Sequence, residues 1–68
     1  MRKAALSKRE MEVVQGVWDG LTAREIGDRL CISDKTVEQH RFHVNRKWGV
    51  KNPVQLVRRA LQEGLVSL

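Results

Sequence analysis

The fold is decided by residues 22–37, which read Thr22-Ala23-Arg24-Glu25-Ile26-Gly27-Asp28-Arg29-Leu30-Cys31-Ile32-Ser33-Asp34-Lys35-Thr36-Val37. Thr22 and Glu25 have the spacing of a capping box, in which the two residues exchange side chain–backbone hydrogen bonds at the start of a helix. That helix should run to about Leu30. Ser33 has the chemistry of the N-cap of a second helix. The stretch therefore predicts two helices separated by a turn at residues 31–32.

Such a short turn forces the two helices to cross steeply. A steep crossing needs a small residue on the first helix, a turn residue that tolerates positive φ and an apolar residue pointing back from the second helix. Gly27, Cys31 and Val37 occupy these three places, while Ile26 and Leu30 line the inner side. This spacing is typical of a helix-turn-helix, whose second helix enters the DNA major groove. A plain corner between two helices of a small bundle has the same spacing.

The flanking sequence predicts one further helix on each side. Ser7 and Glu10 form another capping box, and Asn52 precedes Pro53 as a cap precedes the first residue of a helix. The glycines that follow the first, third and fourth helices are placed for left-handed C-terminal positions: Gly20, Gly49 and Gly64. The predicted bounds are 7–19, 22–30, 33–48 and 52–63. We therefore expect an all-α, four-helix domain with a helix-turn-helix and a supporting fourth helix.

Length and composition limit the class of protein. A chain of 68 residues makes one domain. One cysteine, Cys31, excludes an internal disulfide and fits a cytoplasmic location. Apolar runs are too short to span a membrane, and the basic residues 1–6 lack the apolar core of a signal peptide. We expect residues 1–6 to be a flexible basic arm and residues 7–68 to be the domain.

Positive charge is concentrated in one part of the chain. The net charge is +5, which favours a polyanionic partner. Residues 33–51 contain five Lys or Arg against two acidic residues, whereas residues 22–32 are balanced. The excess thus lies partly on the second helix of the predicted helix-turn-helix, where a nucleic acid would be contacted.

Longer motifs along the chain resemble a known family. They are Leu6-Ser7-x-Arg9-Glu10-x-Glu12-Val13, Gly20-Leu21-Thr22-x-x-Glu25-Ile26-Gly27, Ile32-Ser33-x-Lys35-Thr36-Val37-x-x-His40-Arg41, Arg46-Lys47-Trp48-Gly49-Val50 and Val54-Gln55-Leu56-Val57-x-x-Ala60. Together they resemble the LuxR-type helix-turn-helix domain, also called the GerE or NarL/FixJ type, from Leu6 to about Val66. Gly27, Cys31 and Trp48 depart from the family's usual residues; Trp48 needs a larger pocket, which we expect it to share with Trp18.

The resemblance implies a function. It is sequence-specific binding of double-stranded DNA in bacterial transcription regulation, with the third helix in the major groove and homodimerisation on DNA through the fourth helix. It also implies a receiver or ligand-binding domain upstream if Met1 is a boundary within a longer protein. RNA polymerase is a further candidate partner; no membrane partner is expected.

The third helix divides into two faces by its periodicity. Val37, Val44 and Trp48 form the inward stripe. In the family, base contacts concentrate at positions that match Glu38, Gln39 and Phe42 on the opposite face. Lys35 lies beside them, so the expected base-reading set is Lys35, Glu38, Gln39 and Phe42. Glu can accept from cytosine N4, Gln can pair with adenine, and Phe can contact the thymine methyl. The alternative for Glu38 is an ion pair with Arg41.

The expected phosphate contacts are of two kinds. Hydroxyl and N–H groups at helix N-termini can bind phosphate oxygens, and long cationic side chains can reach the DNA backbone. The first kind comprises Thr22, Ser33 and Thr36, and the second comprises Arg41, Arg46, Lys47 and Lys51.

The predicted fourth helix has more apolar surface than one core needs. Leu56, Val57, Ala60 and Gly64 share one side. The remaining stripe is a candidate two-fold interface, made by Val54, Arg58, Leu61 and Leu65. The alternative is that Leu61 and Leu65 pack under the C-terminal residues 66–68.

Other functions have little support. His40 and His43 have a spacing that can bind a metal, but no third ligand completes a site. We therefore expect no metal and no cofactor. No nucleophile–base set is visible, so an enzyme is not expected. The main rival is a helix-turn-helix that binds another protein instead of DNA. Region 4 of a sigma factor shares the first three helices, but a fourth helix that opens with Asn52-Pro53 favours the LuxR type.

Overall fold

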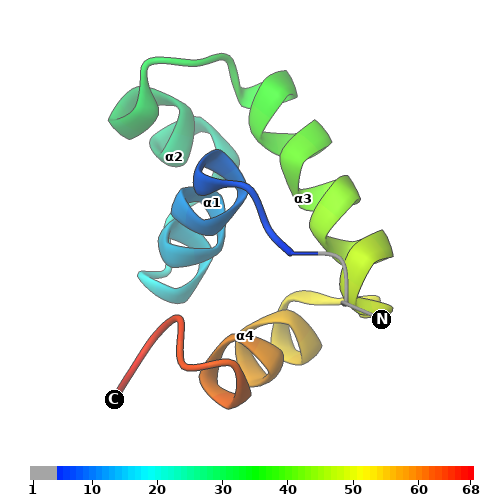
Figure 1. The fold of residues 1–68 in the computed structure, drawn as a ribbon. Helices are drawn as coiled ribbons and strands as arrows, with labels where there is room; N and C mark the ends of the chain where they lie inside the picture. The colour runs from blue at the N-terminus through cyan, green and yellow to red at the C-terminus, as the bar shows by residue number, and fades with distance from the viewer. Residues whose placement is uncertain (1–4) are drawn as a thin grey trace.

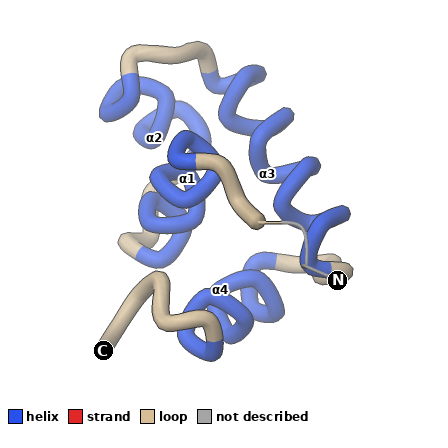
Figure 2. Tube along the Cα trace, viewed as in Figure 1, coloured by secondary structure: helices blue, strands red, loops and turns tan. Residues whose placement is uncertain are grey.

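The computed structural model describes residues 5–68, which form four helices and no strand. The helices are α1 (Lys8–Trp18), α2 (Ala23–Leu30), α3 (Asp34–Trp48) and α4 (Pro53–Gln62). Figure 1 shows α1 at the centre, with α2 and α3 beside it and α4 across one end, and Figure 2 shows the short loops between them. The all-α, four-helix prediction is confirmed. Of the arm predicted at residues 1–6, residues 1–4 lie outside the described residues.

Both predicted capping boxes form. At α1, Glu10 N donates to Ser7 Oγ (3.1 Å) and Ser7 N donates to Glu10 Oε1 (2.8 Å). At α2, Glu25 N donates to Thr22 Oγ1 (3.2 Å) and Thr22 N donates to Glu25 Oε1 (2.8 Å). Each box satisfies two backbone N–H groups that a helix start leaves without partners. The starts of α1 and α2 are thus set by local hydrogen bonds.

The remaining predicted boundaries are also confirmed. Ser33 Oγ accepts from Thr36 N (3.0 Å) at α3, and Asn52 Oδ1 accepts from Gln55 N (2.9 Å) at α4. Cys31 takes the left-handed conformation with φ 60°, as the short turn requires. Because this conformation costs a non-glycine residue about 1 kcal/mol or more, the packing around the turn must hold Cys31 there.

The core consists of two clusters on either side of α1. Val13, Ile26 and Val37 form the first where α1, α2 and α3 meet. The tight crossing depends on missing side chains: a Cβ on Gly16 would lie 2.5 Å from Ile26 Cγ1, and one on Gly27 would lie 2.6 Å from the Ile32 carbonyl oxygen. Since real Cβ contacts are longer, a larger residue at Gly16 would push α1 away from α2, and one at Gly27 would push α2 away from the turn that follows it.

The second cluster joins α1, α3, α4 and the C-terminal segment. Its buried members are Val14, Val44, Leu56, Ala60 and Val66. Both tryptophans, Trp18 and Trp48, pack against it and are half-buried. The Trp48 ring is also covered by the Arg59 guanidinium, which lies 5.3 Å from the ring centroid, and Arg59 Nη1 donates to the Trp48 carbonyl (3.2 Å). The larger side chain at this position is thus accommodated between α3 and α4.

Candidate nucleic-acid interface

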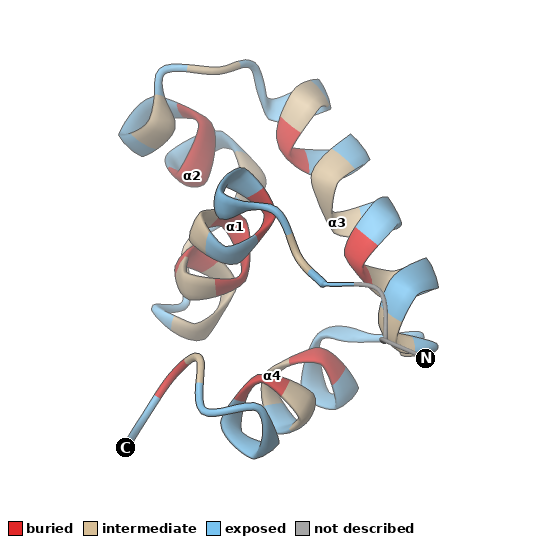
Figure 3. Ribbon diagram, viewed as in Figure 1, coloured by how far each residue is buried: buried red, intermediate tan, exposed pale blue. Residues whose placement is uncertain are grey.

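One side of α3 packs on the core and the other is exposed. Val37 and Val44 are fully buried, and Figure 3 shows these buried segments facing α1 while the outer side of α3 is exposed. The outer side carries an open depression lined by Lys35, Glu38, Gln39, Phe42 and His43. The structure therefore brings together all four residues predicted to read bases. The predicted set did not include His43. Its i+4 spacing from Gln39, which places both residues on this face, was the signal that could have identified it.

Phe42 is the main apolar surface of this depression. The residue is 57% exposed, which is unusual for a large aromatic residue on a small domain. The Arg46 guanidinium lies 5.8 Å from the ring centroid, within range of a cation–π interaction, and the His43 ring lies 6.1 Å away. Phe42 therefore has two side-chain neighbours, Arg46 and His43, and much of its surface stays open to a ligand.

Some lysines and arginines form ion pairs with acidic side chains, and others do not. Within residues 5–68 the pairs are Arg9–Glu12, Lys47–Glu10, Arg29–Asp19 and Arg59–Glu63. Of the lysines and arginines outside these pairs, four lie on α3 or directly after it: Lys35, Arg41, Arg46 and Lys51. Arg41 is half-buried, and its Nε has no hydrogen-bond partner. Positive charge is thus available along α3.

Glu38 does not form the ion pair that was its alternative. In the described part of the chain, neither Arg41 nor another cation lies within ion-pair distance of its carboxylate. Glu38 is exposed and lines the depression. Its oxygens are therefore free to accept hydrogen bonds from a ligand.

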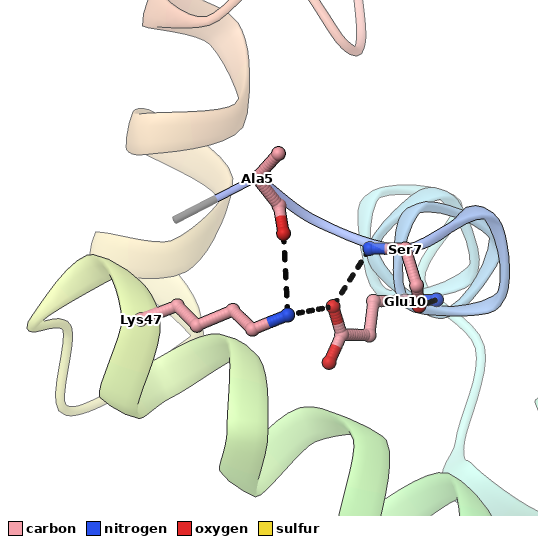
Figure 4. Close-up of polar contacts among 4 residues, drawn as sticks. All are labelled: Ala5, Ser7, Glu10 and Lys47. Carbon is pink, nitrogen blue, oxygen red and sulfur yellow. Dashed lines mark hydrogen bonds and ion pairs between the residues drawn. The ribbon is translucent and has the colours of Figure 1, made fainter. Parts of the chain in front are cut away.

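Lys47 is engaged within the fold. Its Nζ lies 2.7 Å from Glu10 Oε1 and donates to the Ala5 carbonyl oxygen (3.2 Å). Figure 4 shows the ammonium between these two acceptors, with Ser7 donating to the same Glu10 oxygen. Glu10 is only 5% exposed. Lys47, predicted as a phosphate contact, therefore joins the end of α3 to the start of α1, and contact with DNA would require it to leave these partners.

The environment of Glu10 favours its ionised form. Burial raises the pKa of Glu10, but the hydrogen bonds with Lys47 and Ser7 and the positive charge of Lys47 together lower it by more, so the pKa lies below the ordinary value of 4.5. Because the folded-state pKa is the lower one, the unfolded chain takes up the proton more readily as the pH falls. The Glu10 contribution to stability is therefore complete above about pH 4.5 and is lost as the pH falls through the folded-state pKa.

Replacing Glu10→Gln should lower the free energy of unfolding at pH 7 by about 1–3 kcal/mol, because the ammonium of Lys47 loses its charged partner. Thermal unfolding followed by circular dichroism between pH 7 and pH 3 would measure this. The difference between wild type and variant should shrink below pH 4.5. The control is Glu12→Gln, whose pair with Arg9 is solvent-exposed and should contribute little. A difference that stays constant with pH would contradict this account of Glu10.

The predicted hydroxyl contacts lie at helix caps. Thr22 Oγ1 accepts from Glu25 N, which leaves its O–H able to donate. Ser33 Oγ and Thr36 Oγ1 lie 2.9 Å apart and share one hydrogen bond. One hydroxyl proton of that pair therefore remains available for a phosphate oxygen, at the N-terminus of α3.

The candidate two-fold interface, which forms the outer stripe of α4, is largely exposed. Val54 is 63% exposed and Leu61 is 37% exposed, Arg58 is exposed, and Leu65 is half-buried. On the opposite side Leu56 and Ala60 are buried. In the C-terminal segment it is Val66 that inserts into the core. Leu61 therefore keeps 37% of its surface exposed, which leaves apolar area for a partner, and its packing under residues 66–68 stays an alternative.

Residues 5–68 lack two other features. No group of three His, Cys, Asp or Glu side chains is placed to hold a metal ion. None of the four helices is long and apolar enough to cross a bilayer.

Comparisons with known proteins agree with this geometry. The model of the family "Bacterial regulatory proteins, luxR family" matches residues 4–60. The chain is 38% identical over 63 residues to the uncharacterized response regulatory protein YgeK of Escherichia coli K12, covering 93% of this chain and 43% of that protein. It is 41% identical over 62 residues to the oxygen regulatory protein NreC of Staphylococcus aureus JH9, covering 91% of this chain and 29% of that protein.

A solved structure is also similar. The crystal structure of the response regulator ChrA of a heme-sensing two-component system matches with a TM-score of 0.87 and 36% identity, over 97% of this chain and 33% of that one. The chain thus spans less than half the length of these relatives. With its helix-turn-helix, the chain belongs to the luxR family of bacterial regulatory proteins, a family of DNA-binding transcription regulators.

Proposed function

We propose that this chain binds specific sequences of double-stranded DNA, with α3 in the major groove, and so regulates transcription in the bacterial cytoplasm. The observation that carries the proposal is the depression on the outer face of α3. It contains the four side chains whose chemistry suits base edges, Lys35, Glu38, Gln39 and Phe42, and the helix also carries cations outside any ion pair of the described residues. A helix with this combination can read bases and bind the backbone together.

Each residue of the depression has a distinct proposed role. Gln39 pairs with the N6 and N7 edge of adenine, Glu38 accepts from cytosine N4, and Phe42 contacts a pyrimidine methyl group. Lys35 lies in the first turn of α3 and can reach either guanine or a phosphate. Base contacts of this kind supply sequence preference, because each base pair presents its own pattern in the major groove.

We expect contacts with phosphate groups to fix the position of α3 on the DNA. The hydroxyls of Thr22, Ser33 and Thr36 supply donors at helix N-termini, and Arg41, Arg46 and Lys51 supply charge. Lys47 joins α3 to α1 through its ion pair with Glu10. It therefore affects DNA binding indirectly, by stabilising the position of α3. Two protomers would bind adjacent half-sites as a homodimer through the α4 stripe, which consists of Val54, Arg58, Leu61 and Leu65.

Its relatives support a place for this domain in a larger protein. YgeK and ChrA are response regulators that extend well beyond the matched region. We place the chain as the DNA-binding output domain of such a regulator, with RNA polymerase as a further partner. The family is a class of DNA-binding regulators and not a class of enzymes, and the proposal needs no cofactor.

Gln39→Ala should weaken binding to the preferred site by about 1–3 kcal/mol and relax the preference at one base pair, because a bidentate contact with adenine is lost. The site is first selected from random duplexes, and affinities are then measured by fluorescence anisotropy. Lys51→Ala is the matched control and should weaken all duplexes to a similar extent. Equal loss on specific and random duplexes for Gln39→Ala would show that Gln39 does not read a base. A chain that prefers no sequence would refute the proposed function.

A further inference from the structure

Glu38 and Phe42 are placed to contact the same base. They lie one helical turn apart on the exposed side of α3 and line the same depression. Side chains with this i, i+4 spacing start about 5–6 Å apart and run along the same face. Both can therefore reach the major-groove edge of one pyrimidine, where the hydrogen-bonding group and the C5 position are adjacent.

The Glu38 carboxylate selects cytosine at that position. It has no ion-pair partner within the described residues, and an ionised carboxylate can only accept hydrogen bonds. Cytosine presents the N4 amino group as a donor, whereas thymine presents the O4 acceptor. Thymine would therefore place two acceptors against each other.

The Phe42 ring favours a base that carries an apolar group next to the N4 amino donor. One neighbour of the ring is the Arg46 guanidinium, and Phe42, which is 57% exposed, lines the depression together with Glu38. Ordinary cytosine has only a hydrogen at C5, so it buries little of this surface. Thymine has a methyl group at C5 but the wrong partner for Glu38. A cytosine with a C5 methyl group satisfies both side chains.

Building on the proposed function, we infer that Glu38 and Phe42 together form a site for 5-methylcytosine, so that the chain binds C5-methylated DNA more tightly than the same unmethylated sequence. Lys35, Gln39 and His43 complete the depression around this base. Methylation of an operator at C5 would then strengthen regulation by this protein.

The test replaces each cytosine of the selected duplex with 5-methylcytosine, one at a time, and measures the dissociation constant of the full chain. At one position the affinity should rise about fourfold, as expected for burying one methyl group. Phe42→Ala should lose this gain. Met11→Ala, which truncates an exposed apolar side chain on α1, should keep it.

A second variant tests the partner of Phe42. At the same position, replacing the cytosine with thymine should weaken wild-type binding about tenfold. Glu38→Gln should remove this difference, because an amide can donate to O4 as well as accept from N4. Sequence-specific binding that no methyl group strengthens, or a gain that survives Phe42→Ala, would overturn this inference alone. Loss of all sequence-specific binding by the wild type would instead refute the proposed function.

Discussion

Duplex binding should weaken about 10⁴-fold as the salt concentration rises from about 50 to 200 mM. The reason is the charge on α3 and directly after it: Lys35, Arg41, Arg46 and Lys51 lie outside the ion pairs of the described residues. If each neutralises one phosphate, the slope of log K against log salt is about −3.6 per protomer and about −7 for two protomers on one site. Fluorescence anisotropy over this range of salt would measure the slope.

The same titration separates cations that bind phosphate from those that hold the fold. Lys51→Ala should make the slope about 0.9 less negative per protomer, because one phosphate contact is lost. Lys8→Ala removes an exposed cation from α1 and should leave the slope unchanged. Lys47→Met should lower thermal stability through Glu10 with little effect on the slope. A slope near zero for the wild type would refute DNA binding and favour the rival in which this helix-turn-helix binds another protein.

Most of the fold could be predicted because the signals at the helix ends are local. Ser7 with Glu10 and Thr22 with Glu25 exchange their hydrogen bonds across three residues, a distance at which spacing alone identifies the partners. The exposed face of α3 followed from helical periodicity in the same way, since α3 can bury only one side. The residues proposed to read bases on that face came from the resemblance to the family. These parts of the structure depend little on how the helices pack.

Contacts between distant residues could not be predicted in this way. Lys47 and Glu10 are 37 positions apart, and nothing in the charge pattern distinguishes this lysine from its unpaired neighbours on α3. The insertion of Val66, and not of its neighbours, into the core is a further contact of this kind, because it depends on the course of the C-terminal segment.

Leu61→Glu should abolish cooperative binding to a palindromic site and weaken binding there about 100-fold, the typical gain when two linked contacts act together. An interface with one helix from each protomer is smaller than the roughly 1,200 Å² of a stable complex. We therefore expect a monomer in solution at about micromolar concentration and a dimer only on DNA, where half-sites about one helical turn apart hold the protomers together. A charge at Leu61 would then face its own copy across the two-fold axis.

The structure makes this variant informative because Leu61 is already 37% exposed, as part of a stripe with Val54. Helical circular dichroism and affinity for a single half-site should therefore stay close to those of the wild type. Gln62→Glu, which adds the same charge to the neighbouring exposed position of α4, is the matched control and should remain cooperative. If Leu61→Glu unfolds, Leu61 belongs to the core, and if it still binds the palindrome cooperatively, the protomers meet through another surface. Cooperativity lost with half-site affinity intact would identify the outer stripe of α4 as the surface that pairs two protomers on DNA.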